Sequence, residues 1–266
     1  MDVAKDEAPV SYELRGPVAL VGLNRLAKRN AISDRVIEAI AAAVARAEAE
    51  ARAAVIFGHG DHFCAGLDLG EHVSKSMMAA VRGSRRWHEV FGQMERGTIP
   101  WVAALHGAVI GGGLELASAT HIRVADPSAF FALPEGQRGI YVGGGGSVRT
   151  ARLMGANRMA DLMLTGRVVT AEEAERWGVV QYLVPRGGAL ARALELAEAA
   201  AGNAVMSNYA VINALPRIQD MSSEDGLFVE SLMSSLASAT PEAEERLRAF
   251  LEKRARKLDI PSGEGQ

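Results

Sequence analysis

Three segments of the chain bring small residues and carboxylates together, a combination that suits chemistry at an acyl group. Residues 63–69 (FCAGLDL) and 106–117 (HGAVIGGGLELA) each follow a predicted strand, where small residues let the backbone approach a ligand. Residues 133–139 (LPEGQRG) lead into a run of four glycines. The triple glycine precedes an apolar stretch predicted to be helical, and the first N–H groups of a helix have no partner within it. Two such donors from separate loops can hold a developing oxyanion, with Glu115 in the first helical turn beside them.

The same residues also have a purely structural interpretation. A triple glycine permits close packing of a helix on a sheet, and the helix dipole favours a glutamate such as Glu115 in the first turn. Glu135, directly after Pro134, fits a solvent-facing turn. Residue chemistry alone leaves both interpretations open.

Other common site motifs are absent from the sequence. The glycine clusters do not spell G-x-G-x-x-G, no Gly-Lys pair forms a phosphate-binding loop, and Arg149 stands where a nucleophile elbow around Ser147 needs glycine. Four potential metal ligands lie close together, namely His59, Asp61, His62 and Cys64. Without a C-x-x-C or H-E-x-x-H pair, we favour a solvated turn and predict no metal site.

Strand-like and helical stretches alternate in the first half of the chain. We expect strands at 10–14, 18–23, 53–57 and 101–105, with a hairpin at Arg15-Gly16-Pro17. We expect helices that start after Ser33, with apolar positions at Val36, Ile37, Ile40 and Val44, and at 75–95, 114–119, 147–154, 171–177, 189–201 and 241–257. This alternation predicts a parallel sheet with crossover helices, followed by a helical C-terminal extension.

The composition of the 266 residues narrows the choice of partners and compartment. With 23% charged residues and a net charge of −3, the chain offers no field of one sign for nucleic acid or a membrane surface. A single cysteine excludes an intrachain disulfide framework. Residues 97–114 carry no charge and are long enough to span a membrane, but Pro100, His106 and five glycines argue against it. Residues 1–9 do not read as a signal peptide, so we expect a soluble, cytoplasmic protein.

Taken together, the three segments resemble the crotonase (enoyl-CoA hydratase/isomerase) superfamily. Residues 23–31 (LNRLAKRNA) are similar to the family's N-R-P-x-x-x-N-A stretch, and residues 249–254 (AFLEKR) add a fourth match near the C-terminus. The resemblance implies an α/β fold, a spiral of β-β-α repeats, with the core over residues 1–200. It also implies a helical trimerisation region over residues 201–266 and a homo-oligomer, either a trimer or a dimer of trimers.

The resemblance further implies the roles of the site residues. The backbone N–H groups of Leu67 and Gly112 would hold a thioester oxygen, and Glu115 and Glu135 would hold a water between them, helped by the N–H of Gly143. Hydratases of this family carry both glutamates. Related dienoyl-CoA isomerases have aspartate at the position of Gly143, and simple isomerases usually lack the first glutamate. The sequence therefore favours addition of water to an enoyl-CoA.

Coenzyme A would arrive as part of the substrate, and no permanently bound cofactor is expected. The residues that the resemblance assigns to it are Lys28, Arg29, Ala31, Ala65, Gly66, Leu67, Asp68 and Leu69, together with Phe250 and Lys253, which match positions that often reach a neighbouring subunit's ligand.

The acyl group is the least determined part of this prediction. Leu26 and Val142 replace prolines usual in the family, and residues 85–88 (RRWH) with Tyr141 suggest a short or polar-tailed acyl chain. Helix packing near a subunit contact explains Trp87 and His88 equally well. Residues 115–121 and 133–146 also resemble the branch that hydrates methylthioacryloyl-CoA. The alternatives are thioester hydrolysis, isomerisation, or acyl-CoA binding without catalysis.

Overall fold

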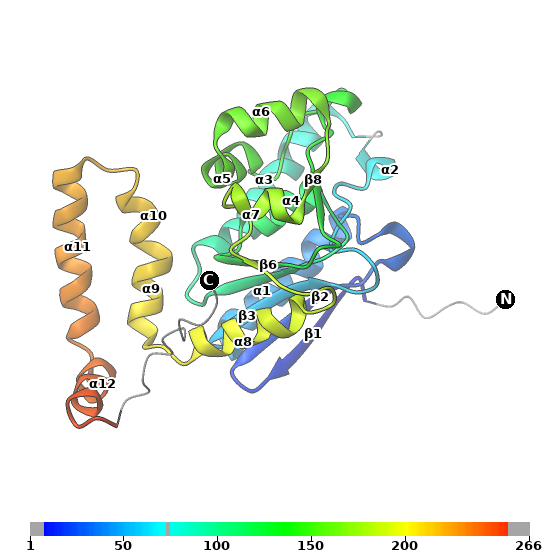
Figure 1. Cartoon of the computed structure of the whole chain (residues 1–266). Coiled ribbons are helices and arrows are strands. Elements are labelled where there is room, and N and C mark those ends of the chain that lie inside the picture. Colours follow the sequence, from blue (N-terminus) through cyan, green and yellow to red (C-terminus); the bar gives the residue numbers. More distant parts are fainter. Residues whose placement is uncertain (1–7, 73–74, 255–266) are drawn as a thin grey trace, which may run out of the picture. The chain divides into compact units, whose positions relative to one another are not determined.

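Short apolar runs from distant parts of the chain form a six-stranded sheet in the computed structural model, which describes residues 8–72 and 75–254 (Figure 1). The strands follow the order β1 (Val10–Arg15), β2 (Val18–Leu23), β3 (Ala53–Gly58), β4 (Trp101–Leu105), β6 (Ile122–Ala125) and β9 (Tyr182–Leu183). Strands β1 and β2 form an antiparallel hairpin, and the other neighbours are parallel. The predicted strands and their parallel pairing are therefore confirmed.

A second sheet of three short strands contains β5 (Ala108–Ile110), β7 (Phe130–Ala132) and β8 (Val169–Thr170). A parallel bridge between Cys64 and Val109 extends it by one position. The chain thus passes repeatedly from the large sheet to the small one and then into a helix. Strands β4 and β5 lead to α4 (Gly112–Ser118), while β6 and β7 lead through the 3-10 turn η2 (Gly136–Arg138) to α5 (Gly146–Met154). These are the expected β-β-α repeats.

Helices cover both faces of the large sheet. On one face, α1 (Asp34–Glu50) and α3 (Met77–Glu95) pack on alternate side chains of the strands, such as Val21, Ile56 and Ala103. On the other face, α8 (Ala189–Ala201) packs its alanines on Val18, Val55 and Val102 (Figure 1). The remaining elements of this part are η1 (Leu26–Lys28), α2 (Leu69–His72), α6 (Ala156–Thr165) and α7 (Ala171–Arg176).

The chain separates into two compact units, residues 1–203 and 204–266. The second unit holds α9 (Val205–Asn213), α10 (Leu215–Ile218), α11 (Ser223–Ser238) and α12 (Pro241–Leu251). The sequence pattern indicated only the last of these, and the prediction that it runs to residue 257 was wrong. It ends at Leu251, and Lys253 has a positive φ of 57°, which does not continue a helix. Residues 255–257 lie outside the described residues.

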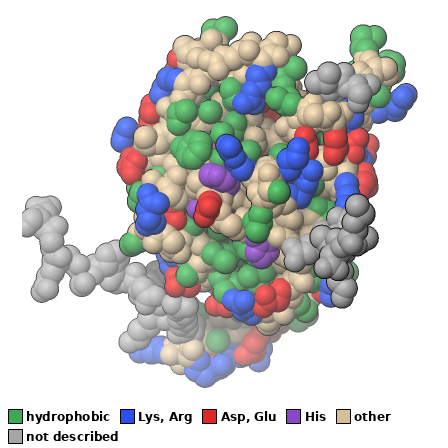
Figure 2. All heavy atoms as spheres, turned by 90° about the vertical axis from the view of Figure 1, so that its right-hand side faces the viewer, with side chains coloured by type: hydrophobic (Ala, Val, Ile, Leu, Met, Phe, Trp, Pro, Cys, Tyr) green, Lys and Arg blue, Asp and Glu red, His purple; other side chains and the backbone are tan. Residues whose placement is uncertain are grey.

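The uncharged run over residues 97–114 begins with the half-buried Gly97 and the exposed Thr98 and continues into β4, β5 and the start of α4, which are largely buried. Among the described residues, no helix is both long enough and apolar enough to cross a membrane. On the face shown in Figure 2, Lys and Arg side chains are interspersed with Asp and Glu, in keeping with the balanced composition.

Candidate active site

The loop after β3 carries one of the two N–H groups predicted to bind a thioester oxygen. Backbone hydrogen bonds hold this loop on both sides: Cys64 donates to the Ala108 oxygen (2.9 Å), and Ile32 donates to the Gly66 oxygen (2.7 Å). Asp68 in turn donates to the Ile32 oxygen (2.9 Å). Within the described part of the chain, the N–H of Leu67 makes no hydrogen bond, although its neighbours on both sides are engaged. It is therefore held rigidly and is available to a ligand.

The second N–H group belongs to Gly112, the first residue of α4, where a helix has no acceptor of its own. A Cβ atom built on Gly112 would lie 3.5 Å from the Leu67 nitrogen, and one built on Gly66 would lie 3.4 Å from the Gly112 nitrogen. The structure therefore brings the two predicted N–H groups together. The turn into α4 requires glycine, because Gly111 has φ 52° and ψ −120°.

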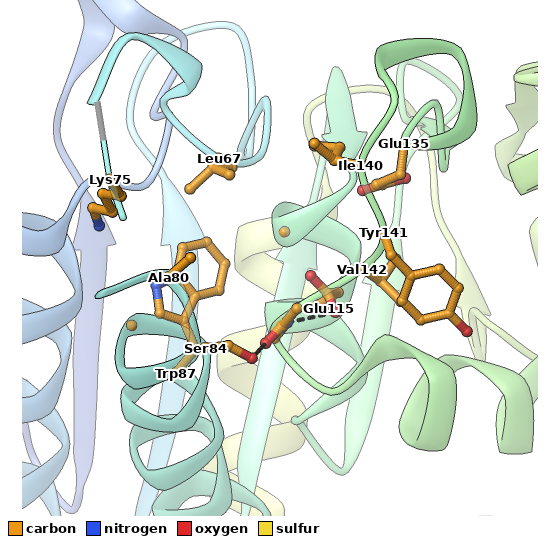
Figure 3. A pocket seen from close by; sticks show the side chains of 14 residues that line it. Leu67, Lys75, Ala80, Ser84, Trp87, Glu115, Glu135, Ile140, Tyr141 and Val142 are labelled. Atoms are coloured by element: carbon orange, nitrogen blue, oxygen red, sulfur yellow. Dashed lines mark hydrogen bonds between the residues drawn. The ribbon is translucent and has the colours of Figure 1, made fainter. Parts of the chain in front are cut away.

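Glu115 is buried, with 3% of its surface exposed, in the first turn of α4. Its side chain is labelled in Figure 3. Its Oε1 accepts hydrogen bonds from the N–H groups of Gly144 (2.8 Å) and Gly146 (2.7 Å). Burial raises the pKa of this carboxyl, while the N–H groups of Gly146, Gly144 and Gly143 act in the opposite direction. The glycine run therefore forms a turn that binds the side chain of Glu115, an arrangement that favours its carboxylate form.

Glu135 is also buried, with 7% exposed, but its surroundings differ. Among the described residues its Oε2 has no hydrogen-bond partner. Burial raises the pKa of Glu135 to about 7, and the nearby charge of Glu115 contributes to the increase. Near neutral pH this group holds a proton for a large part of the time.

Both glutamates and both N–H groups border one cavity of about 90 Å³ (Figure 3). Its lining residues are Leu67, Lys75, Ala80, Gly83, Ser84, Trp87, Gly112, Glu115, Glu135, Ile140, Tyr141, Val142, Gly143 and Gly144. The five catalytic candidates come from four segments. Leu67 lies in the loop after β3, Gly112 and Glu115 at the start of α4, Glu135 directly before η2, and Gly143 in the turn before α5.

The expectation that residues 85–88 together shape the acyl pocket was wrong, because only Trp87 borders this cavity. Helix α3 turns Ala80, Gly83, Ser84 and Trp87 toward it, and these positions share one face of a helix. Arg86 lies on another face, where it binds Glu38 at 2.7 Å. Tyr141 does line the cavity, with 68% of its surface exposed.

Three positioning contacts were not anticipated from the sequence. Ser84 donates its hydroxyl to the Gly143 oxygen (2.6 Å), and Arg149 donates to the Gly144 oxygen (3.0 Å). Arg25 pairs with Asp68 at 3.1 Å. No motif marks Ser84 or Arg149, whereas Arg25 and Asp68 stand in the segments 23–31 and 63–69, which did not indicate that they pair. For Ser84, the only available signal was its i, i+4, i+7 relation to Ala80 and Trp87.

The two N-terminal stretches predicted to bind coenzyme A lie side by side. The N–H of Ala65 donates to the Arg29 oxygen (3.0 Å), while the side chains of Lys28 and Arg29 are exposed and Ala31 is buried. Asp68 is buried and bound to Arg25, so its carboxylate serves the loop itself. Leu69 begins α2, and Phe250 and Lys253 belong to the second unit. Coenzyme A binding by all these residues stays a prediction.

Of the four residues weighed as metal ligands, His59, His62 and Cys64 have separate contacts. His59 shares a hydrogen bond with Ser11 (2.8 Å), and His62 accepts one from the N–H of Ala108 (3.1 Å). Cys64 is buried, and burial raises the pKa of its thiol to about 12. No group of three or more His, Cys, Asp or Glu side chains is placed to hold a metal in the described ranges.

Comparisons with known proteins agree with this geometry. A sequence model of the enoyl-CoA hydratase/isomerase family matches residues 13–259. The chain is 34% identical over 249 residues to enoyl-CoA hydratase EchA19 of Mycobacterium tuberculosis, covering 91% of this chain and 93% of that protein. It is 32% identical over 239 residues to 2,3-dehydroadipyl-CoA hydratase of Escherichia coli, with coverage of 89% and 93%.

Solved structures give the same result. A protein of Rhodopseudomonas palustris, provisionally named an enoyl-CoA hydratase, shares 49% identity at a TM-score of 0.90, covering 92% of this chain and 95% of that one. Enoyl-CoA hydratase from Bacillus anthracis shares 30% identity at a TM-score of 0.87, with coverage of 92% and 97%.

Proposed function

This chain belongs to the enoyl-CoA hydratase/isomerase family, and from that premise we propose that it adds water across the α,β double bond of a short acyl-CoA thioester. One observation carries the proposal: two buried glutamates and two adjacent N–H groups border the same small cavity. The pair of carboxyls suits acid–base chemistry, and the N–H pair suits an oxyanion.

The N–H groups of Leu67 and Gly112 receive the thioester oxygen in this proposal. When a water oxygen bonds to Cβ, the π electrons of the double bond shift to the bond between Cα and the thioester carbon, and the carbonyl π electrons move onto the thioester oxygen, which produces an enolate. The two donors are already in place, so they stabilise the negative charge without reorganisation. Each donor of this kind contributes about 3–4 kcal/mol to the lowering of the barrier.

The two glutamates divide the proton transfers. Glu115 is bound by backbone N–H groups and acts as the carboxylate that takes a proton from the attacking water. Glu135, whose pKa burial raises to about 7, starts protonated and delivers its proton to Cα as the enolate collapses. Afterwards Glu115 holds a proton and Glu135 is ionised, so one proton transfer between them restores the resting state. The N–H of Gly143 helps to hold Glu115 and the water.

The lining of the cavity supports a short acyl chain with an apolar tail. Trp87 packs against the backbone at Gly112 and Gly144, where built Cβ atoms would lie 2.6 Å and 2.8 Å from its ring, and it forms part of the cavity wall. The Ser84 hydroxyl is engaged by Gly143, and Lys75 pairs with Asp34 at 2.6 Å. A thioether tail such as that of methylthioacryloyl-CoA suits this space, and we propose it as the acyl group, with thioester cleavage as a following step.

We also propose that the protein works as a homo-oligomer, a trimer or a dimer of trimers. The second unit presents large apolar side chains, among them Leu227, Phe228, Leu232 and Leu236 on α11, each at least 49% exposed. Surfaces of this kind are typical of contacts between subunits.

A panel of enoyl-CoA thioesters tests the proposed reaction. Crotonyl-CoA and methylthioacryloyl-CoA should lose their enoyl-thioester absorbance in the presence of the protein without added metal or nucleotide. Mass spectrometry should then find the corresponding hydroxyacyl-CoA thioesters. A thiol-reactive dye in the same assay detects cleavage to free coenzyme A or methanethiol. Glu115→Gln, which keeps the shape of the side chain, serves as the folded control and should be inactive.

The acyl preference has its own test. Trp87→Ala should raise the activity on a longer enoyl-CoA relative to crotonyl-CoA, because removal of the indole ring enlarges the cavity that this ring lines. Unchanged absorbance for every thioester with the wild-type protein would contradict hydration altogether. Equal preference for long and short chains in both proteins would contradict the role of Trp87.

A further inference from the structure

The glycine turn that binds Glu115 is itself held by a buried arginine. Arg149, in the second turn of α5, has 8% of its surface exposed, and its Nη1 donates to the carbonyl oxygen of Gly144 at 3.0 Å. Its Nε donates to Oε2 of Glu95, the last residue of α3, at 2.9 Å. Arg149 therefore links the turn to a helix that borders the other side of the cavity.

These contacts determine which way the backbone of the turn points. The N–H of Gly144 is directed to Glu115, while the carbonyl of the same residue is directed to Arg149. The next residue, Gly145, has a φ of 103°, and a Cβ atom there would overlap the guanidinium. If the guanidinium were absent, the carbonyl of Gly144 would lose its partner and the turn would be free to rotate its N–H groups away from Glu115.

The charge of Arg149 also acts on the site. It lowers the pKa of Glu115, against the effect of burial. The titratable and charged groups that face this region are Glu95, His88 and Arg85 from α3, Arg96 at the end of α3, and Glu135 from the loop across the cavity. Burial and the charge of Arg149 lower the pKa of His88, so this imidazole is neutral where Glu115 must be ionised.

We propose that Arg149 is a positioning residue for the hydration reaction: it holds the 143–146 turn in the orientation that binds the Glu115 carboxylate, and Glu95 holds Arg149 in place. The proposal rests on the proposed function, because it assigns to the turn the task of presenting Glu115 to a water. It adds two residues that do not touch the substrate and that lie 54 positions apart in the sequence.

The test compares Arg149→Gln, Arg149→Lys and Glu95→Ala with Arg152→Gln, an exposed arginine on the same helix. For Arg149→Gln we expect kcat to fall about 10- to 100-fold, with KM within about twofold, because misplacement of Glu115 affects the chemical step. When kcat is measured against pH, the acid limb of the curve should move to higher pH, because loss of the Arg149 guanidinium raises the pKa of Glu115. Arg149→Lys keeps the charge but cannot reach both oxygens, so its kcat should fall while the acid limb stays in place.

Glu95→Ala should lower kcat less than Arg149→Gln, and Arg152→Gln should match the wild-type protein. Circular dichroism and thermal melts establish how much of each variant is folded. The proposal is wrong if Arg149→Gln keeps the kcat and acid limb of Arg152→Gln, or if its activity falls only in proportion to the folded fraction. A wild-type protein that hydrates no thioester would instead overturn the proposed function, so the two failures are distinguishable.

Discussion

Glycines 111–113 and glycines 143–146 both stand at the start of a helix, α4 and α5, where the backbone N–H groups have no partner within the helix. In the first cluster the N–H of Gly112 stays available beside that of Leu67. In the second cluster the N–H groups of Gly144 and Gly146 bind the side chain of Glu115. Unpaired N–H groups at the start of a helix can therefore bind either a ligand or a carboxylate of the protein itself. Which of the two they bind depends on the group that lies opposite them.

The largest effect should come from the first cluster. Gly112→Ala places a Cβ atom 2.6 Å from the ring of Trp87 and 3.5 Å from the Leu67 nitrogen, in the space that the thioester oxygen would enter. We expect kcat/KM on crotonyl-CoA to fall about 10²- to 10³-fold, the usual effect of losing an oxyanion donor. Gly70→Ala is the control, because its Cβ atom meets only Asp68 at 3.4 Å. Equal activity of the two variants would contradict the oxyanion role of Gly112.

A smaller and different loss should follow from the second cluster. In Gly146→Ala, the new Cβ atom would lie 2.9 Å from Oε1 of Glu115 and displace the carboxylate. We expect kcat to fall about 10-fold to 100-fold while KM changes little, because the thioester contacts remain. Steady-state kinetics of Gly112→Ala and Gly146→Ala side by side measure this difference. If Gly146→Ala raises KM and leaves kcat unchanged, the two glycine clusters do not have the separate roles described here.

The contrast between the two glutamates predicts how stability depends on pH. In the described part of the chain, Glu135 receives none of the glycine N–H hydrogen bonds that hold Glu115, and its pKa of about 7 in the folded protein exceeds the ordinary value of 4.5. Between these pH values the folded protein keeps a proton that the unfolded chain releases, so the wild-type protein should lose stability as the pH rises through this window. The loss should amount to up to about 3 kcal/mol relative to Glu135→Gln. Urea unfolding of both proteins at pH 5 and pH 8 measures this loss. If the free energy of unfolding changes with pH in the same way in both proteins, the pKa of Glu135 is not raised by folding.

The smallest expected effect comes from the start of a third helix, α1, where Ser33 is the N-cap. At α1 the side chain of Ser33 accepts the N–H of Val36 at 3.3 Å, so a side chain satisfies a donor that α4 leaves available. Ser33→Ala should lower the free energy of unfolding by about 1 kcal/mol with unchanged kcat, while Ser33→Thr retains the cap and most of the stability. Chemical denaturation checks the first expectation and the crotonyl-CoA assay the second. A loss of activity in Ser33→Ala without a loss of stability would mean that this cap also serves the site.

Much of the fold could be predicted because its signals are local. Strand β4 and helix α8 have the expected limits, and Ser33 caps the expected helix. Helix α12 was predicted too long, and the other helices of the second unit were not predicted at all. Many apolar side chains of that unit are exposed, so its pattern lacks the single buried stripe that identifies an amphipathic helix.

The site was predicted in part, for a similar reason. The resemblance to the family identified Leu67, Gly112, Glu115, Glu135 and Gly143 as candidates, and the structure places all five around one cavity. The acyl side of the cavity was predicted less well, because the phase of α3 selects Trp87 and excludes Arg86. A shift of one residue on a helix turns a side chain by about 100°, which the sequence alone did not resolve.

The sequence by itself determined which residues could take part in a reaction, the alternation of strands and helices, and the run of glycines before α4. Only the tertiary structure decided that the 143–146 turn binds Glu115 and that Arg149 contacts both this turn and Glu95. It also decided that one buried oxygen of Glu135 has no partner among the described residues. The physical reason is the range of the interactions involved. Helix periods and turns depend on neighbours within a few residues, whereas hydrogen bonds between segments and the burial that raises a pKa depend on how distant segments pack.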